Sequence, residues 1–148
     1  MDYPLGKAEG VAEPGARYGE PLLVLPRLGQ GSFRVIVTDA YDRRCAITEE
    51  KTLPTLEAAH IKPYSQEGPH SVDNGILIRS DFHRLLDAGY ATVTTDHHLE
   101  VSRRIHDEFD NGEYYYTFHG KRLHVPVQEQ YQPSQEFLTW HNENIFRR

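Results

Sequence analysis

The segment over residues 55–89 constrains the fold of this chain most, because its local signals follow one another in a fixed order. The run TLEAAHI favours a β-strand, and Pro63 stops it. The polar run SQEGPHSVDNG predicts a loop, and ILI a short extended piece behind it. Ser80 is a suitable N-cap for the helix DFHRLLDA, which Gly89 closes. We therefore expect strand, long loop and helix at the centre of the fold.

Regular elements are predicted on both sides of this segment. Phe33 and the apolar residues that follow it at helical spacing predict a helix over 33–43, with Ser32 as N-cap. CAIT is a predicted strand, YATVTT and LEVS predict a hairpin, and GEYYYTF and RLHVP predict another pair of strands. A last helix begins at Pro133-Ser134, and its expected inward side chains are Phe137, Leu138, Trp140 or His141, and Ile145. The fold class is therefore α+β, with helices and β-hairpins around the central segment.

The first residues of the chain differ in composition from the rest. Residues 1–31 hold half of the chain's 11 Gly and 9 Pro and show no sustained periodicity. We expect an N-terminal arm or linker over 1–26, whose run LLVL could dock on the domain or form an edge strand, and one domain over 27–148. Such a beginning suits a domain that follows another in a longer protein.

Composition and charge exclude several classes. No apolar run approaches the roughly 18 residues that span a membrane, and no secretory pattern is present, so a cytoplasmic protein is expected. Cys45 is the single cysteine, which excludes an internal disulfide and a Cys-x-x-Cys zinc site. The formal charge of −6 argues against a general electrostatic clamp on nucleic acid, although a local basic surface, a metal or another chain could supply the affinity.

Four residues of the central segment can carry chemistry. His60 ends the predicted strand close to Pro63, and histidine is the commonest general base, although a single strand-end histidine is more often structural. His83 and Asp87 are four residues apart on the predicted helix, so they share one face and could hold a divalent ion. Alternatively, Asp87 could be a solvated residue near the C-terminus of the helix, and His83 could pack under the hairpin. Asn74 can bridge backbone groups and hold the long loop shut.

The residues His60, Asn74 and His83, in this order, are part of a motif that resembles a known family. The string AAHIKP…VDNG…RSDFHRLLDAG resembles the motif of the HNH endonucleases, which have a ββα-metal (His-Me finger) core of two strands, a loop and a helix around one divalent cation. GQGSFRVIVTDAYDRRCAIT and FLTWHNENIF resemble the bacterial HNH subgroup of restriction and other defence proteins. The resemblance covers roughly residues 28–146.

The resemblance implies a metal-dependent hydrolysis of DNA phosphodiester bonds. His60 would take a proton from the attacking water, and His83 would hold the metal, which stabilises the developing charge. Asn74 would be a positioning residue, with nearby backbone fixing the imidazole's tautomer. The products would carry 5′-phosphate and 3′-hydroxyl ends. Mg²⁺ is the expected ion, with Mn²⁺, Ni²⁺ and Zn²⁺ as alternatives.

The sequence departs from the common pattern at Ala59, where many HNH enzymes carry a metal ligand. Asp87 is the first candidate to replace that ligand, because it combines the helical spacing with the position of a second helix ligand in colicin-type members. Glu57 is the second candidate, since it lies on the same strand face as Ala59. Asp81 is expected to cap the helix and point away.

Lys62, Arg79 and Arg84 flank the motif and are the expected contacts to the DNA backbone. A solvated surface is the competing interpretation for all three. His70 is interpreted as a loop residue without a role. The expected partners are DNA, a separate or fused specificity domain, and a second copy of the chain, because cutting both strands favours a homodimer.

Two further functions stay open. One is a catalytically inactive HNH-fold module that only binds nucleic acid, which Ala59 favours and the presence of His60 and His83 opposes. The other is a metal-binding structural or interaction domain, which gives His60 no role.

Overall fold

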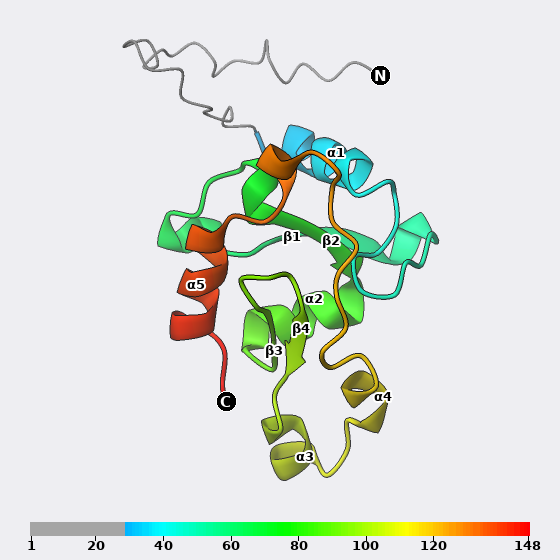
Figure 1. The fold of residues 1–148 in the computed structure, drawn as a ribbon, viewed down its shortest axis with the longest axis vertical. Coiled ribbons are helices and arrows are strands. Elements are labelled where there is room, and N and C mark those ends of the chain that lie inside the picture. The colour runs from blue at the N-terminus through cyan, green and yellow to red at the C-terminus, as the bar shows by residue number, and fades with distance from the viewer. Residues whose placement is uncertain (1–28) are drawn as a thin grey trace.

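A computed structural model describes residues 29–148 (Figure 1). The expected arm over 1–26, with its run LLVL, lies outside the described residues. The helices and strands, in chain order, are α1 (Gln30–Ala40), β1 (Leu56–His60), β2 (Gly75–Arg79), α2 (Ser80–Ala88), β3 (Ala91–Val93), β4 (Leu99–Val101), α3 (Arg104–Phe109), α4 (Glu113–Tyr116) and α5 (Gln135–Asn144). Short 3-10 turns lie at Leu53–Thr55, Tyr64–Gln66, Val72–Asn74 and Glu129–Tyr131.

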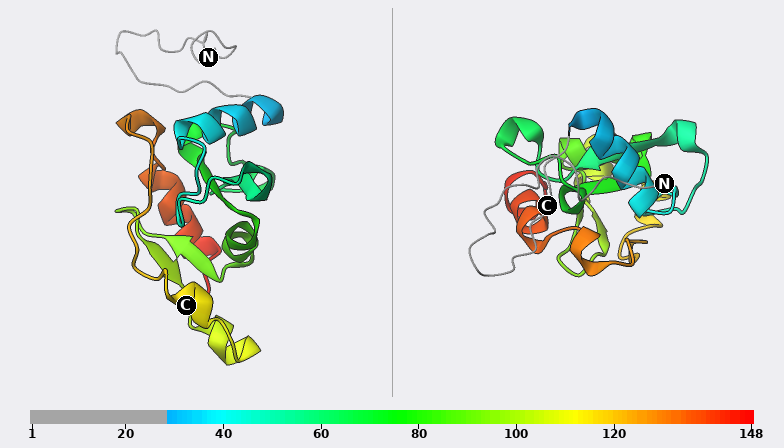
Figure 2. Two further views of the ribbon diagram at one scale, coloured as in Figure 1. Left: turned by 90° about the vertical axis from the view of Figure 1, so that its right-hand side faces the viewer. Right: turned by 90° about the horizontal axis from the view of Figure 1, so that it is seen from above.

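The central unit is an antiparallel pair of strands followed at once by a helix. Leu56 of β1 lies opposite Arg79 of β2, and His60 lies opposite Gly75. The predicted long loop joins these two strands, and α2 begins directly after β2. Helices α1 and α2 both pack on the strand pair, α1 on one side and α2 on the other (Figures 1 and 2). The predicted order of strand, loop and helix is confirmed.

Helix α1 differs from its prediction at both ends. It begins at Gln30, so Ser32 lies in the first turn and does not cap the helix. It ends at Ala40 because Asp42 and Arg43 adopt left-handed backbone conformations, with φ of 58° and 60°. The predicted apolar face is confirmed, since its buried residues are Phe33, Ile36 and Val37.

The end of α1 is joined to the start of β2. Tyr41 is fully buried and its hydroxyl donates a hydrogen bond to the carbonyl oxygen of Gly75, at 3.0 Å. A Cβ atom at Gly75 would lie 2.6 Å from Val37 Cγ2 and 3.0 Å from Phe33 Cζ. Gly75 thus permits a close approach of α1 and β2, which places Phe33 beside the end of β1.

Gly75→Ala is expected to destabilise the protein by about 1–3 kcal/mol, because the added methyl overpacks the contact between α1 and β2. Gly31→Ala is the matched control, since a Cβ there meets no atom within 4 Å. Urea denaturation of both variants measures the difference. Equal stability of the two variants would contradict the close packing.

The predicted strand CAIT is wrong. Residues 45–48 form a turn, in which the amide of Glu49 donates to the carbonyl of Cys45 at 2.9 Å. Only Ala46 makes strand-like bonds: its amide donates to Leu77 O at 2.7 Å, and its carbonyl accepts from His124 N at 2.8 Å. Cys45, Ala46 and Ile47 are buried, so their apolar character reflects core packing.

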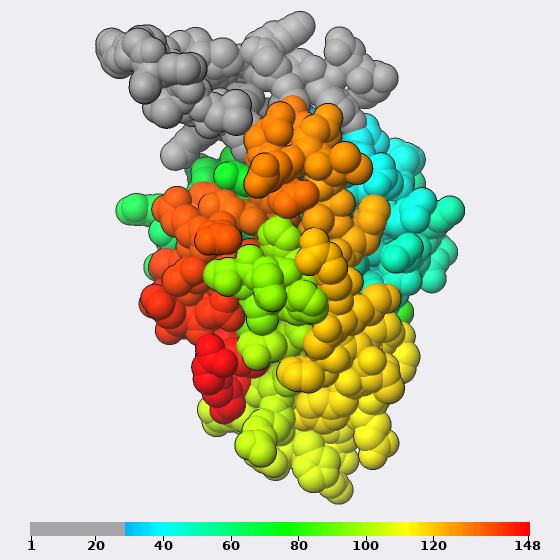
Figure 3. Space-filling model, viewed as in Figure 1, coloured from blue at the N-terminus to red at the C-terminus, as the bar shows by residue number. Residues whose placement is uncertain are grey.

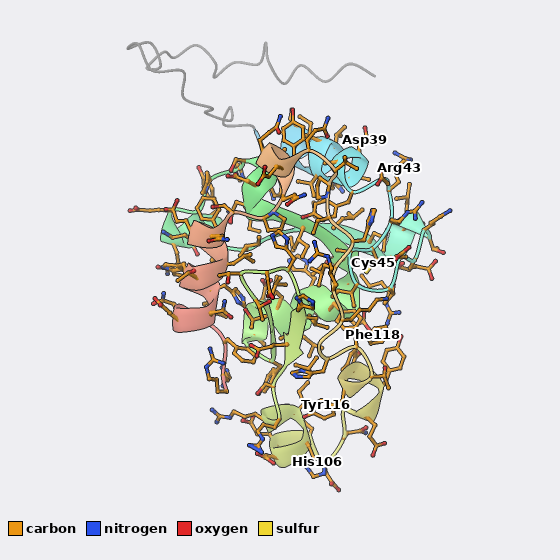
Figure 4. The ribbon with its side chains drawn as sticks, viewed as in Figure 1. Asp39, Arg43, Cys45, His106, Tyr116 and Phe118 are labelled. Atoms are coloured by element: carbon orange, nitrogen blue, oxygen red, sulfur yellow. The ribbon has the colours of Figure 1, made fainter. Side chains whose placement is uncertain are left out.

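The predicted strand pair GEYYYTF and RLHVP is also wrong. RLHVP forms no strand, and only Arg122 makes an isolated antiparallel bridge, with His98. Gly112, with φ of 111°, starts the short helix α4 in place of a strand. The aromatic side chains of this region pack as a cluster, and the rings of Tyr115 and Phe118 meet Phe82 edge to face at 5.3 and 5.5 Å. Phe118 and Tyr116 lie in the lower part of the molecule, towards α3 (Figure 4). The tyrosines predicted a strand because of their high β-propensity, but here they form a packed aromatic cluster.

The remaining predictions for the second half of the chain agree with the structure. β3 and β4 form the expected antiparallel hairpin, which lies between α5 and the segment before it (Figure 3). Ser134 caps α5 and accepts a hydrogen bond from Glu136 N. Of the alternatives Trp140 and His141, His141 is the buried residue. No helix within residues 29–148 has the length and apolar character needed to cross a membrane.

Candidate active site

A pocket of about 210 Å³ lies between the end of β1, the face of α2 and the end of α5. It is lined by His60, Ile61, Pro63, Tyr64, His83, Asp87, His141 and Ile145. Three residues that the sequence selected, His60, His83 and Asp87, therefore face one cavity although they come from a strand and a helix. Among the described residues, no group of three or more His, Cys, Asp or Glu side chains is arranged to hold a metal ion.

His60 is the last residue of β1, and its ring is held from two directions. The ring stacks on Phe33 of α1 with 4.1 Å between centroids and an angle of 13°. Its Nε2 lies 2.9 Å from Nδ1 of His70. Within the described residues, the ring makes no hydrogen bond to backbone, so the expected backbone partner is replaced by a side chain. Burial, and then the nearby His70 and His83, lower the pKa of His60 to about 4.

The lowered pKa keeps His60 neutral near pH 7, which is the form that can accept a proton. The unfolded chain has the ordinary value of 6.5, so it binds a proton between pH 6.5 and 4 that the folded protein does not. This contribution to stability is present above pH 6.5 and is lost as the pH falls towards 4.

The free energy of unfolding is therefore expected to fall more in wild type than in His60→Gln when the pH is lowered from 7.5 to 5. Urea denaturation at the two pH values measures this, with His106→Gln as the control. His106 is exposed and lies in α3, near the lower end of the molecule in Figure 4. An equal loss in wild type and His60→Gln would contradict the lowered pKa.

Asn74 closes the loop that follows His60. Its side chain is fully buried and accepts a hydrogen bond from Lys62 N at 2.8 Å. Its Nδ2 donates to Lys62 O at 2.9 Å and to Pro69 O at 3.0 Å. The carbonyl of Asn74 also accepts from Ile61 N at 3.0 Å. The two ends of the loop are thus joined directly behind His60.

Asn74→Ala is expected to destabilise the protein by about 2–4 kcal/mol, because it leaves buried backbone groups of the loop without partners. Asn144→Ala is the matched control, since its side chain makes one exposed hydrogen bond, to Trp140 O, and should cost less than about 0.5 kcal/mol. Thermal or urea unfolding measures both. A difference near zero would mean that the loop closes without Asn74.

His83 lies between two carboxylates. Its Nδ1 is 2.6 Å from Glu57 Oε1, and its Nε2 is 3.3 Å from Asp87 Oδ2. Helical spacing brings Asp87 to His83, and the packing of α2 on β1 brings Glu57. Burial is the main cause that raises the pKa of Asp87, opposed by His83 and reinforced by Glu57. Both candidate ligands therefore contact His83, but at opposite nitrogens.

Asp81 lies apart from this pocket, as expected. Its carboxylate accepts from the backbone amide of Phe82 and from the guanidinium of Arg79 at 2.7 Å. Hydrogen bonds from Arg79 and from Tyr115 lower the pKa of Asp81, against an opposing effect of burial. Asp81 therefore bonds to Arg79 and to Tyr115 of α4, and not to residues of the pocket.

The three basic residues lie in different surroundings. Lys62 is partly buried, with Nζ 5.4 Å from the centroid of the Trp140 ring. Arg84 is exposed on α2 and forms no ion pair with another described residue. Arg79 pairs with Asp81 and donates to the hydroxyl of Tyr114 at 3.0 Å, so its head group is already bonded.

The sequence interpretation missed one neighbour of His60. His70 contacts His60 through Nδ1, and its ring stacks on Tyr64 at 4.3 Å with an angle of 2°. Loops carry no periodicity from which such a contact could be read. The signal available in the sequence was a third histidine between His60 and Asn74.

Comparisons with known proteins report a family and a fold to which this chain is similar. A family model described as HNH endonuclease matches residues 45–94, which contain β1, β2 and α2. A solved structure titled "Modification dependent TagI restriction endonuclease" is similar over 83% of this chain, with a TM-score of 0.51 and 18% identity. The match covers 42% of that structure's chain, so this chain spans less than half of it. The comparison with curated proteins finds no match.

Proposed function

We propose that this chain hydrolyses DNA phosphodiester bonds with the help of a divalent metal ion, because the HNH endonuclease family model matches residues 45–94. The fold is α+β with the ββα-metal core, formed here by β1, β2 and α2. The observation that carries the proposal is that His60, His83 and Asp87 line the same pocket. A base and the donors for a cation are thus adjacent.

The donors of the pocket fit a metal ion that takes few ligands from the protein. Two atoms that bind one ion at about 2.1 Å in an octahedral site lie about 3 Å apart. The distance of 3.3 Å between His83 Nε2 and Asp87 Oδ2 is close to this value. Mg²⁺ commonly takes one or two protein ligands and completes its shell with water and substrate phosphate. We therefore assign His83 and Asp87 as the ligands, with Mg²⁺ or Mn²⁺ as the expected ion.

Glu57 has a different proposed role. It contacts Nδ1 of His83, the nitrogen that does not face Asp87. A ligand histidine commonly donates its other N–H to a carboxylate, which fixes the tautomer and the ring orientation. Glu57 therefore orients His83, which leaves Nε2 free to bind the ion. Ala59 contributes no ligand, and it is fully buried.

His60 is the proposed general base. It accepts a proton from the water that attacks the phosphorus, and its neutral form is available at pH 7. The ion, when bound, stabilises negative charge on the phosphate and the leaving oxygen. Asn74 holds the loop so that His60 keeps its position. Lys62 and Arg84 are the proposed phosphate contacts, and Arg79 contributes least because its guanidinium is bonded to Asp81 and Tyr114.

We further propose that residues 27–148 form the cleavage module of a restriction or defence enzyme. The likeness to a restriction endonuclease over less than half of that enzyme's length supports a module that works with a fused or separate specificity domain. A homodimer would allow both strands to be cut.

Supercoiled plasmid incubated with the 148-residue chain tests the proposal. With Mg²⁺ or Mn²⁺ we expect nicked and then linear DNA. With EDTA we expect the plasmid to stay supercoiled. The ends should carry 5′-phosphate and 3′-hydroxyl groups, which ligation of the products checks directly. A chain that retards DNA in a gel but leaves it intact with every metal would instead favour the inactive binding module.

A further inference from the structure

The tautomer of His60 depends on its contact with His70. The hydrogen bond between His60 Nε2 and His70 Nδ1 is 2.9 Å long, and only one of the two nitrogens can donate. If His70 donates, Nε2 of neutral His60 is the acceptor and its proton lies on Nδ1. If His60 donates, its Nδ1 carries a lone pair. The direction of this one bond therefore decides which nitrogen of His60 can act as a base.

The two nitrogens of His60 have different surroundings. Nε2 is occupied by His70, whereas Nδ1 has no hydrogen-bond partner among residues 29–148. Within that part of the chain, Arg44 Nε is the one buried side-chain nitrogen or oxygen without a partner, so Nδ1 of His60 is open to solvent. The ring itself lines the pocket that also contains His83 and Asp87. A water molecule can therefore approach Nδ1 without displacing a protein group, whereas Nε2 is already bonded to His70.

We propose that His70 is a positioning residue for His60: it accepts the Nε2–H of His60 and thereby keeps Nδ1 unprotonated and open to the pocket. The catalytic part of this inference rests on the proposed function. The tautomer of His60, however, is a property of the folded chain and can be measured without catalysis. For the acceptor role, His70 must carry its own proton on Nε2.

Stacking fixes both rings in this arrangement. His60 stacks on Phe33 of α1, and His70 stacks on Tyr64, whose side chain is largely exposed at the edge of the pocket. The rings of His60 and His70 are tilted by 59°, with centroids 5.0 Å apart. The pair is therefore held by aromatic contacts on its two outer sides.

The proton balance of the step is simple. The O–H bond of the attacking water breaks, and its proton forms an N–H bond at Nδ1 of His60. The oxygen of that water bonds to phosphorus as the bond to the 3′ oxygen breaks, and the released 3′ oxygen takes a proton from solvent water to become the 3′-hydroxyl group. His60 becomes an imidazolium ion that still donates its Nε2–H to His70. No proton has to move onto His70, which acts through His60 and touches no reacting atom.

Two variants separate the acceptor from the ring. His70→Phe keeps an aromatic ring that can stack on Tyr64 and removes the acceptor. His70→Asn keeps an acceptor oxygen close to the position of Nδ1 and removes the ring. Two-bond ¹H–¹⁵N NMR spectra of the metal-free protein at pH 7.5 report which nitrogen of each imidazole is protonated, and His60→Gln identifies the signals of His60.

We expect His60 to be protonated at Nε2 in wild type and in His70→Asn, and to become a mixture of tautomers in His70→Phe. An Nδ1-protonated His60 in wild type, or an unchanged tautomer in His70→Phe, would overturn the proposal. This readout does not require catalysis, so it decides the inference even for a chain that cuts no DNA.

Cleavage kinetics provide the second readout. We expect kcat to fall about tenfold in His70→Phe with KM unchanged, since one net hydrogen bond is worth about that factor. His70→Asn should recover most of the rate. A fall in kcat together with a rise in KM in both variants would indicate a structural role and would overturn the positioning role. Absence of cleavage in wild type would refute the proposed function alone.

Discussion

His60→Gln is expected to lower the maximal rate of DNA cleavage by about 10²–10⁴-fold, the contribution of a general base. Glutamine retains much of the volume that packs on Phe33, so the fold should persist, but its amide cannot accept a proton near pH 7. Single-turnover nicking of plasmid DNA at saturating Mn²⁺ measures the effect.

His106→Gln is the control for this substitution. His106 is an exposed histidine of α3, outside the pocket. The control should cut at the rate of wild type. If His60→Gln retains more than about a tenth of the wild-type rate, the loss is smaller than a general base contributes, and this result would contradict that role for His60.

The second large effect concerns metal binding. His83→Ala is expected to abolish measurable binding of Mn²⁺, because it removes the proposed nitrogen ligand. Asp87→Asn should weaken binding by more than the about 10–100-fold that changes to the surrounding hydrogen bonds commonly cost. Calorimetric titration of the DNA-free protein measures each affinity without reference to catalysis.

Glu57→Gln discriminates between a ligand and an orienting residue. The amide oxygen of glutamine can still accept the Nδ1–H of His83, so an orienting Glu57 tolerates this change with at most about a tenfold loss. If Glu57 were instead the ligand, Glu57→Gln would weaken binding strongly and Asp87→Asn would not. That result would reverse the assignment of the two carboxylates.

Short-range signals in the sequence predicted the part of the fold that positions the site. Gly89 ends α2 with φ of 87°, as its place after the apolar helical pattern implied. The spacing of His83 and Asp87 required only that this helix form. The contact of Glu57 with His83 spans β1 and α2, and the sequence could suggest it only through the alternation of side chains along a strand.

Contacts that depend on tertiary packing could not be predicted in the same way. Cys45, Ala46 and Ile47 are apolar because they fill the core, and a short apolar run does not distinguish a strand from a buried turn. Tyrosine has a high propensity for strands, but the tyrosines of α4 lie in a helix, where their rings pack on Phe82 and Phe118. His70 meets His60 only because Asn74 closes the loop between them.

The dependence of cleavage rate on Mn²⁺ concentration tests the central claim most directly, when wild type, His60→Gln and Asp87→Asn are measured together. We predict that His60→Gln lowers the maximal rate and leaves the half-saturating Mn²⁺ concentration unchanged. Asp87→Asn should raise that concentration. Wild-type cleavage that persists in EDTA, or a His60→Gln variant with the wild-type maximal rate, would contradict an endonuclease that uses His60 as base beside a metal held by His83 and Asp87.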